Sequence, residues 1–258
     1  MNSAMKEDRK RRLSQRPLPA ELKLGSQFKP VERLITSSTS PWAVSADAAQ
    51  VLACLVVAGN RRRILEFGAG VSSQVFAAAL REIGGGSLTS VEEHPEWCEE
   101  AWAQVQAVPG VDSMLVASRV RLTIDRRGVY FGYSRRDEII RRGPFDLVFV
   151  DAPYGAMGRD GALHACFEAL APGALIVLDD SARDREQGVL RRWLSTYPGL
   201  DVMANDPDVA RGLSILSYAS PGSGRPSFSL AAWTSGALDL LQSTGAIWRY
   251  RRRKLEWS

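Results

Sequence analysis

The sequence of 258 residues is poor in cysteine and histidine and has no long run of apolar residues. Its three cysteines, Cys54, Cys98 and Cys166, are widely separated and show no C-x-x-C spacing, which excludes a disulfide framework and a zinc-finger type of site. The longest apolar run, residues 51–59, is far shorter than the roughly 20 residues that cross a bilayer. The basic amino terminus also lacks the apolar segment of a secretory signal. We therefore expect a cytoplasmic protein without a membrane span.

Positive charge is concentrated at the two ends of the chain. The net charge is +4, yet residues 1–16 and residues 249–258 each have a net charge of +4, so the remainder is negative. Segment 248–257 also interleaves aromatic and basic residues. Such ends are either solvated tails or contacts for nucleic acid or an acidic partner. We predict a flexible basic arm (1–35), one domain (36–219) and a carboxyl-terminal extension with a basic aromatic tail (220–258).

Strands and helices alternate along the middle of the sequence. Ser45 is a candidate N-cap for a helix over 46–57, and apolar helical patterns follow most of the strands. The alternation predicts an α/β fold with a doubly wound, mostly parallel, seven-stranded Rossmann-like sheet and an antiparallel edge strand. The expected strands are 63–67, 87–91, 116–124, 145–150, 174–178, 200–204 and 212–218.

Four acids end four of these strands, and one strand runs into a glycine turn. Because parallel strands end at the same rim, Glu66, Glu92, Asp151 and Asp179 should converge on one crevice. Gly68 and Gly70 allow a sharp turn with positive φ and a close approach of the backbone to a ligand. A G-x-G pattern alone is equally typical of an ordinary packing turn.

From about Ser37 to Ser217, the order of these segments resembles the class I S-adenosylmethionine-dependent methyltransferases. Segment 66–70, E-F-G-A-G, resembles the first motif of that family, and segment 90–97 resembles the second. Segment 145–155 resembles the fourth motif, and segment 170–180 resembles the strand and turn that follow it. The resemblance implies S-adenosyl-L-methionine as cofactor, with Glu92 on its ribose hydroxyls and Glu93 as the alternative. The other implied cofactor residues are Glu66, Gly68, Ala69, Gly70, Ser72 and Asp151.

A nicotinamide-dependent Rossmann enzyme is the main competing fold assignment. Its fingerprint, G-x-G-x-x-G, requires a third glycine where this sequence has Ser73. The methyltransferase fold is therefore favoured.

The acids after the later strands resemble those of catechol-type O-methyltransferases. In those enzymes, equivalents of Asp151, Asp179 and Asp180 bind magnesium, an ion that prefers oxygen ligands. Those enzymes commonly place a lysine base three residues after the first acid, whereas this chain has Tyr154. Asp151, Tyr154 or a metal-bound water is then the candidate proton acceptor. The alternative is that Asp179 and Asp180 cap the helix expected from Arg183.

We favour O-methylation of a small molecule, with magnesium as an optional participant. Segment 151–154, D-A-P-Y, also differs by one residue from the D-P-P-Y motif of enzymes that methylate amino groups of nucleic-acid bases or proteins. A third interpretation is a non-catalytic module that binds the cofactor and holds a partner through its tails. No feature of the sequence indicates the oligomeric state.

Overall fold

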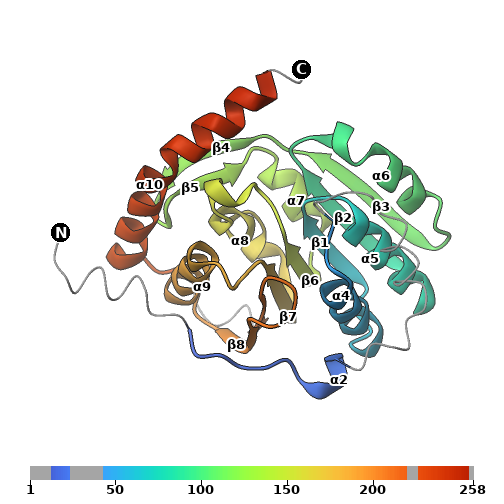
Figure 1. The fold of residues 1–258 in the computed structure, drawn as a ribbon. Coiled ribbons are helices and arrows are strands. Elements are labelled where there is room, and N and C mark those ends of the chain that lie inside the picture. The colour runs from blue at the N-terminus through green and yellow to red at the C-terminus, as the bar shows by residue number, and fades with distance from the viewer. Residues whose placement is uncertain (1–12, 24–42, 220–225, 256–258) are drawn as a thin grey trace.

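The computed structural model describes residues 13–23, 43–219 and 226–255. Within these ranges, seven strands form one sheet in the order β3-β2-β1-β6-β7-β9-β8 (Figure 1). Every neighbouring pair is parallel except β7 with β9 and β9 with β8. The strands are β1 Arg63–Phe67, β2 Gly86–Glu92, β3 Val111–Ala117, β6 Phe145–Val150, β7 Leu170–Asp179, β8 Leu200–Asp206 and β9 Leu213–Tyr218.

The predicted fold class is confirmed, including the antiparallel strand near one edge. β9 is that strand, and it lies between β7 and β8, so that β8 is outermost. The expected third strand, 116–124, was wrong in its bounds. β3 ends at Ala117, and Val120–Asp125 forms a separate strand, β4. β4 leaves the sheet because it pairs with β5, Gly128–Tyr133, in a two-stranded antiparallel hairpin.

Helices cover both faces of the sheet (Figure 1). Ser45 caps α4 as expected, with its Oγ accepting a hydrogen bond from the backbone N–H of Ala48 at 3.3 Å. The helices are α2 Ala20–Lys23, α4 Ala46–Ala58, α5 Val71–Glu82, α6 Glu99–Gln106, α7 Arg136–Arg142, α8 Asp160–Cys166, α9 Asp184–Thr196 and α10 Leu230–Leu255. Short 3-10 turns are η2 Pro95–Trp97, η3 Gly155–Met157 and η4 Phe167–Ala169.

Alternation of side chains along the strands builds two apolar layers. In β1, Ile64 packs with α4, α5 and α6, while Leu65 packs with α7, α8 and α9 on the opposite face. In β6, Phe149 and Val150 divide in the same way. Because both faces are covered, the central strands are continuous apolar runs, as buried parallel strands require.

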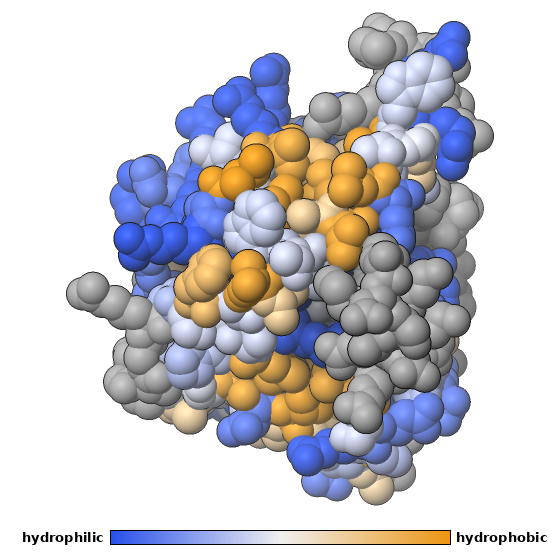
Figure 2. All heavy atoms as spheres, turned by 90° about the vertical axis from the view of Figure 1, so that its left-hand side faces the viewer, coloured by the Kyte–Doolittle hydropathy of each residue, from blue (hydrophilic) through white to orange (hydrophobic). Residues whose placement is uncertain are grey.

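The described parts of both terminal segments lie against the domain. Residues 13–23 run along β8, where Arg16 and Asn205 exchange backbone hydrogen bonds. α10 is tied to α9 by Arg192, whose Nη1 lies 2.7 Å from Oδ2 of Asp239. Figure 2 shows apolar side chains gathered on this side of the molecule, and the exposed apolar residues of α10 are Leu230, Leu241 and Trp248. Residues 1–12 and 24–35 of the predicted arm, and 220–225 and 256–258 of the predicted extension, lie outside the described residues.

No helix in the described ranges is long and apolar enough to cross a membrane.

Candidate active site

The four strand-ending acids lie along one rim of the sheet, as the sequence predicts. Glu66 and Glu92 end β1 and β2, Asp179 ends β7, and Asp151 directly follows β6. β2, β1, β6 and β7 are successive neighbours in the sheet and are parallel. The carboxyl ends of the strands therefore bring together groups that are more than 100 residues apart in sequence.

The glycine turn after β1 has the close backbone approach that was expected at Gly68. This residue has φ of +98°, and a Cβ there would lie 3.1 Å from Cβ of Ala152. Gly70 differs from the expectation, because its φ of 171° is extended backbone that any residue adopts. A Cβ at Gly70 would meet no atom of the described structure within 4 Å. Gly68 is therefore required for the turn, whereas Gly70 borders open space.

Glu66 lies beneath this turn and is fully buried. Its Oε2 accepts hydrogen bonds from Oγ of Ser73 at 2.5 Å and from Oγ of Ser90 at 2.6 Å. Oγ of Ser73 in turn accepts a hydrogen bond from the backbone N–H of Gly70 at 3.0 Å. Burial raises the pKa of Glu66 to about 7, against the hydrogen bonds from the Ser72, Ser73 and Ser90 hydroxyls. Glu66 thus supports the turn from below.

Glu92 lies beside the turn and is partly exposed. Its Oε2 accepts a hydrogen bond from the backbone N–H of Ala69 at 3.1 Å, and its Oε1 accepts one from the N–H of His94 at 2.8 Å. These two bonds fix the carboxylate between the end of β2 and the glycine turn. Glu93, the alternative candidate for the ribose contact, has its Oε2 3.5 Å from Nε2 of His94.

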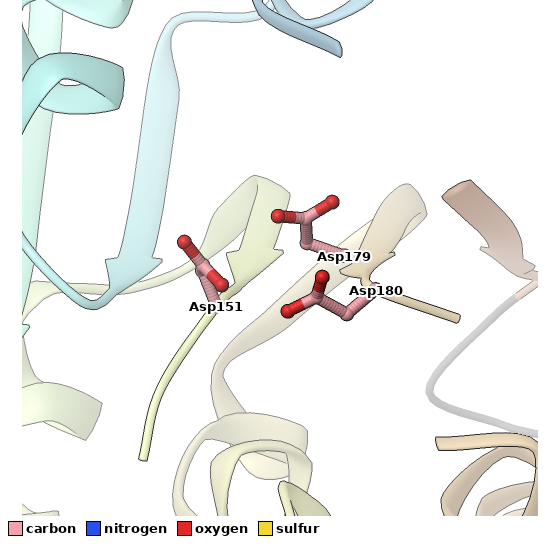
Figure 3. A group of neighbouring side chains, drawn as sticks. All are labelled: Asp151, Asp179 and Asp180. Atoms are coloured by element: carbon pink, nitrogen blue, oxygen red, sulfur yellow. The ribbon is translucent and has the colours of Figure 1, made fainter. Parts of the chain in front are cut away.

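Asp151, Asp179 and Asp180 form one carboxylate cluster. Figure 3 shows the three side chains around a common centre, and one oxygen from each lies within 4.8 Å of the others. The backbone N–H of Asp151 donates to the carbonyl of Phe67 at 2.9 Å, which places this acid next to the glycine turn. Burial raises the pKa of Asp151 to about 7 despite the positive charge of Arg159, and it also raises the pKa of Asp179.

The predicted capping role of the acid pair is not seen. The N-cap residue of α9 is Arg183, and it makes no side-chain capping hydrogen bond. Asp180 has φ of +56° and instead pairs through Oδ2 with Nη1 of Arg183 at 2.9 Å.

Arg159 is the residue of the cluster that sequence reasoning missed. It directly precedes α8, is only 3% exposed and donates from Nη2 to Oδ1 of Asp151 at 2.7 Å and to Oδ2 of Asp180 at 2.9 Å. Its Nη1 also donates to the backbone carbonyl of Asp179 at 2.6 Å. No sequence motif indicates Arg159, because its contact with Asp151, eight residues earlier, forms only in the folded chain.

Tyr154 lies farther out in the loop after β6. Its side chain is 43% exposed, and the residue directly precedes η3. Tyr154 is therefore more exposed than Asp151, whose side chain is 25% exposed.

A basic hollow lies at the opposite end of the sheet. It has a volume of about 400 Å³ and is lined by Arg62, Arg63, Arg141 and Arg142, with Asp112 as its acidic member. Arg63 begins β1, whereas the four acids lie where strands end. The hollow is thus separated from the carboxylate cluster by the length of the strands.

Solved structures of other proteins share the fold of this chain. The chain resembles SAH-bound methyltransferase PaMTH1 of Podospora anserina, with 17% identity over 80% of this chain and 91% of that one, and a TM-score of 0.52. It also resembles a putative caffeoyl-CoA O-methyltransferase from Staphylococcus aureus, with 16% identity over 75% of this chain and 94% of that one, and a TM-score of 0.50. The chain therefore has the same fold as these two methyltransferases.

A sequence comparison identifies a methyltransferase domain within the chain. Residues 65–181 match the family model described as a methyltransferase domain, Methyltransf_24. This range contains all the candidate site residues, from Glu66 to Asp180. No curated protein sequence gives a significant match. The family model and the fold together confirm the resemblance, stated from the motifs, to the class I S-adenosylmethionine-dependent methyltransferases.

Proposed function

We propose that this enzyme transfers a methyl group from S-adenosyl-L-methionine to a hydroxyl oxygen of a small molecule. The observation that carries the proposal is the position of Asp151, a carboxyl group 25% exposed and hydrogen-bonded through its backbone to the strand that enters the glycine turn. A general base must lie within hydrogen-bonding reach of the proton that it removes. Asp151 is placed to accept a proton beside the cofactor cradle. The cytoplasm, where free thiols persist, is the proposed setting, in keeping with three free cysteines.

The cradle consists of the glycine turn and the carboxylate beside it. Open space next to Gly70 leaves room for a ligand to approach the backbone. Glu92, held by Ala69 and His94, is proposed to accept hydrogen bonds from the two ribose hydroxyls, since a carboxylate oxygen can accept more than one. Glu66 and Ser72 are proposed to act from beneath, by holding the turn in shape.

Methyl transfer requires alignment and removal of one proton. S-adenosyl-L-methionine supplies an electrophilic methyl group, so a new O–C bond forms as the C–S bond breaks and the electron pair stays on sulfur. The hydroxyl proton passes to the carboxylate of Asp151. Tyr154, exposed in the loop after β6, is proposed to contact the acceptor and is the alternative base.

The basic hollow argues against a nucleic-acid acceptor. Arginine clusters are typical contacts for phosphates. Here the cluster of Arg62, Arg63, Arg141 and Arg142 lies at the amino ends of the strands, away from Asp151. Nucleic acid bound there would not present a base to the crevice. At Asp151, Arg159 binds Oδ1, which leaves Oδ2 to accept a hydrogen bond from a hydroxylated acceptor.

Cofactor binding is tested by isothermal titration calorimetry with S-adenosyl-L-methionine. Glu92→Ala should weaken binding at least ~100-fold, because two hydrogen bonds to a charged group contribute about 1.5–3 kcal/mol each. The matched control is Glu96→Ala, an exposed acid of the same segment, which should bind like the wild type. Undiminished binding by Glu92→Ala would remove the ribose assignment.

Gly70 provides a second test that separates binding from folding. Gly70→Val adds side-chain atoms where the structure has no neighbour within 4 Å, so the midpoint of thermal unfolding should stay close to that of the wild type. Binding of S-adenosyl-L-methionine should fall at least ~10-fold if the cofactor occupies that space. Unchanged affinity would place the cofactor elsewhere.

The acceptor class is tested by measuring formation of S-adenosylhomocysteine with catechol-type small molecules, a basic protein and transfer RNA. Turnover with a hydroxylated small molecule is the expected result. Turnover only with RNA or protein would support the amino-methyltransferase alternative. Binding of the cofactor without turnover on any acceptor would support the non-catalytic module.

A further inference from the structure

An arginine side chain bridges two acids of the carboxylate cluster and the backbone of the third. Nη2 of Arg159 contacts Asp151 and Asp180 at 2.7 and 2.9 Å, and Nη1 contacts the carbonyl of Asp179 at 2.6 Å. Three aspartates whose oxygens lie within 4.8 Å of one another are a plausible set of ligands for a hard divalent cation. The guanidinium group already binds an oxygen of two of these three acids, Asp151 and Asp180.

Two further arginines complete the neutralisation of Asp180. Its Oδ2 lies 2.9 Å from Nη1 of Arg183, and its Oδ1 lies 2.7 Å from Nε of Arg211. Both oxygens of this candidate ligand are thus already paired with positive charge. Magnesium requires nearly octahedral oxygen ligands at about 2.0–2.1 Å, and it would be repelled by a guanidinium group in contact with two of them. The residues present therefore do not fit a magnesium ion.

The buried charge of Arg159 is supported from a second direction. Glu186, in the first turn of α9, is 1% exposed. Burial alone would lower the pKa of Arg159, but the negative charges of Asp151 and Glu186 raise it. A buried cation with several acidic neighbours is electrostatically stable, whereas adding two further positive charges would oppose it. Arg159 is consequently a fixed part of the cluster.

We infer that Arg159 takes the place of a divalent cation, so that this enzyme transfers methyl groups without a metal, and that Arg159 is a positioning residue for Asp151. The inference rests on the proposed function. Arg159 binds Oδ1 of Asp151 and so orients the carboxylate, which leaves proton acceptance to Oδ2. The positive charge also stabilises the negative charge that develops on the acceptor oxygen as its proton leaves.

The first test measures metal binding and needs no acceptor. Manganese(II) is the probe, followed by electron paramagnetic resonance, with magnesium as competitor. The wild type should bind no manganese at this cluster below millimolar concentrations. Arg159→Ala should acquire a site at least ten times tighter, because the carboxylates of Asp151 and Asp180 then lose the competing guanidinium group. Tight stoichiometric binding by the wild type that Asp180→Asn removes would overturn the inference.

Matched variants show whether an acquired site is the predicted one. Arg183→Ala also removes a cation that contacts Asp180, but Arg183 is 42% exposed and does not bridge the acids, so no manganese site should appear. The double variant Arg159→Ala/Asp180→Asn should lose the binding that Arg159→Ala acquires. If Arg159→Ala does not fold, Arg159→Lys and the wild-type titration still decide the question.

The second test uses turnover once an acceptor is known. Wild-type kcat should be unchanged in excess EDTA, and loss of activity that magnesium restores would contradict metal independence. Arg159→Lys should lower kcat more than it raises the KM for S-adenosyl-L-methionine, because lysine keeps the charge but cannot hold Asp151 and the Asp179 carbonyl in the same geometry. Failure of the proposed function is a different result, namely no cofactor binding or no hydroxylated acceptor.

Discussion

At the scale of the residue, Glu66 combines complete burial with two serine hydroxyl partners. Its pKa is raised from 4.5 to about 7, so the folded protein retains a proton that the unfolded chain releases above about pH 4.5. The contribution of Glu66 to the free energy of unfolding therefore falls as pH rises from about 4.5 to 7. Above pH 7 this loss is complete.

Glu66→Gln removes this titration. The free energy of unfolding of the variant minus that of the wild type should increase between pH 4.5 and 7, by up to about 3 kcal/mol. Urea unfolding at a series of pH values measures the difference, and Glu96→Gln serves as the exposed control. A difference independent of pH would contradict the raised pKa.

Asp151 is the residue on which proton removal depends. Asp151→Asn keeps the size of the side chain but cannot accept the hydroxyl proton, so kcat should fall by about 10²–10⁴-fold. Affinity for S-adenosyl-L-methionine should change less than kcat, since Glu92 and the glycine turn are untouched. Tyr154→Phe is the comparison: a larger loss of kcat there would make Tyr154 the base.

At the scale of the element, close packing of α8 on the hairpin holds the segment that follows Arg159. A Cβ at Gly161 would lie 1.9 Å from the backbone oxygen of Phe131 in β5. Gly161→Ala must therefore push α8 from β5, and we expect the free energy of unfolding to drop by at least ~2 kcal/mol. Arg159 should be displaced with the helix.

Gly245→Ala in α10 is the matched control. The added Cβ would meet only the end of the Arg249 side chain, 3.7 Å away. Because alanine is the better helix former, the variant should gain about 0.5–1 kcal/mol. Urea unfolding of both variants measures the contrast, and equal effects would show that the contact with Phe131 is not restrictive.

Secondary structure was predicted correctly from the sequence where a segment's residue pattern was typical of a single kind of element. The run Phe145–Val150 is apolar on both faces and was assigned correctly, as was the helix that Ser45 caps. The span 116–124 was assigned as one strand because its β-branched residues continue through the turn at Ser118 and Arg119. The β propensity of a segment does not predict the strand with which it pairs. Here β3 pairs with β2, whereas β4 pairs with β5.

At the scale of the whole molecule, residues 13–23 join the amino-terminal segment to the far edge of the sheet. Besides the Arg16–Asn205 pair, the backbone N–H of Leu18 donates to Oδ2 of Asp206 at 2.9 Å, and the Leu18 side chain is buried in the layer that contains α4. β8 is the outermost strand, and an uncovered edge favours unwanted pairing. The segment therefore covers an edge as well as extending the core.

Leu18→Ala should lower the free energy of unfolding by about 2 kcal/mol or more, as expected when a buried leucine is truncated. Leu230→Ala, which truncates a side chain that is 65% exposed, should change it by less than about 0.5 kcal/mol. Thermal or urea unfolding distinguishes the two. A negligible effect of Leu18→Ala would mean that the segment does not contribute to the folded core.

The sequence by itself determined the α/β class, the glycine turn and the rim on which Glu66, Glu92, Asp151 and Asp179 lie. These features follow from local rules, because apolar periodicity and turn residues define parallel strands, and parallel strands end together. Only the tertiary structure decided what surrounds the acids. Arg159, Arg183 and Arg211 contact Asp180 from three different segments, and no local sequence pattern predicts these contacts. The charge at the centre of the site, and with it the choice between a metal ion and a guanidinium group, is a property of the folded chain.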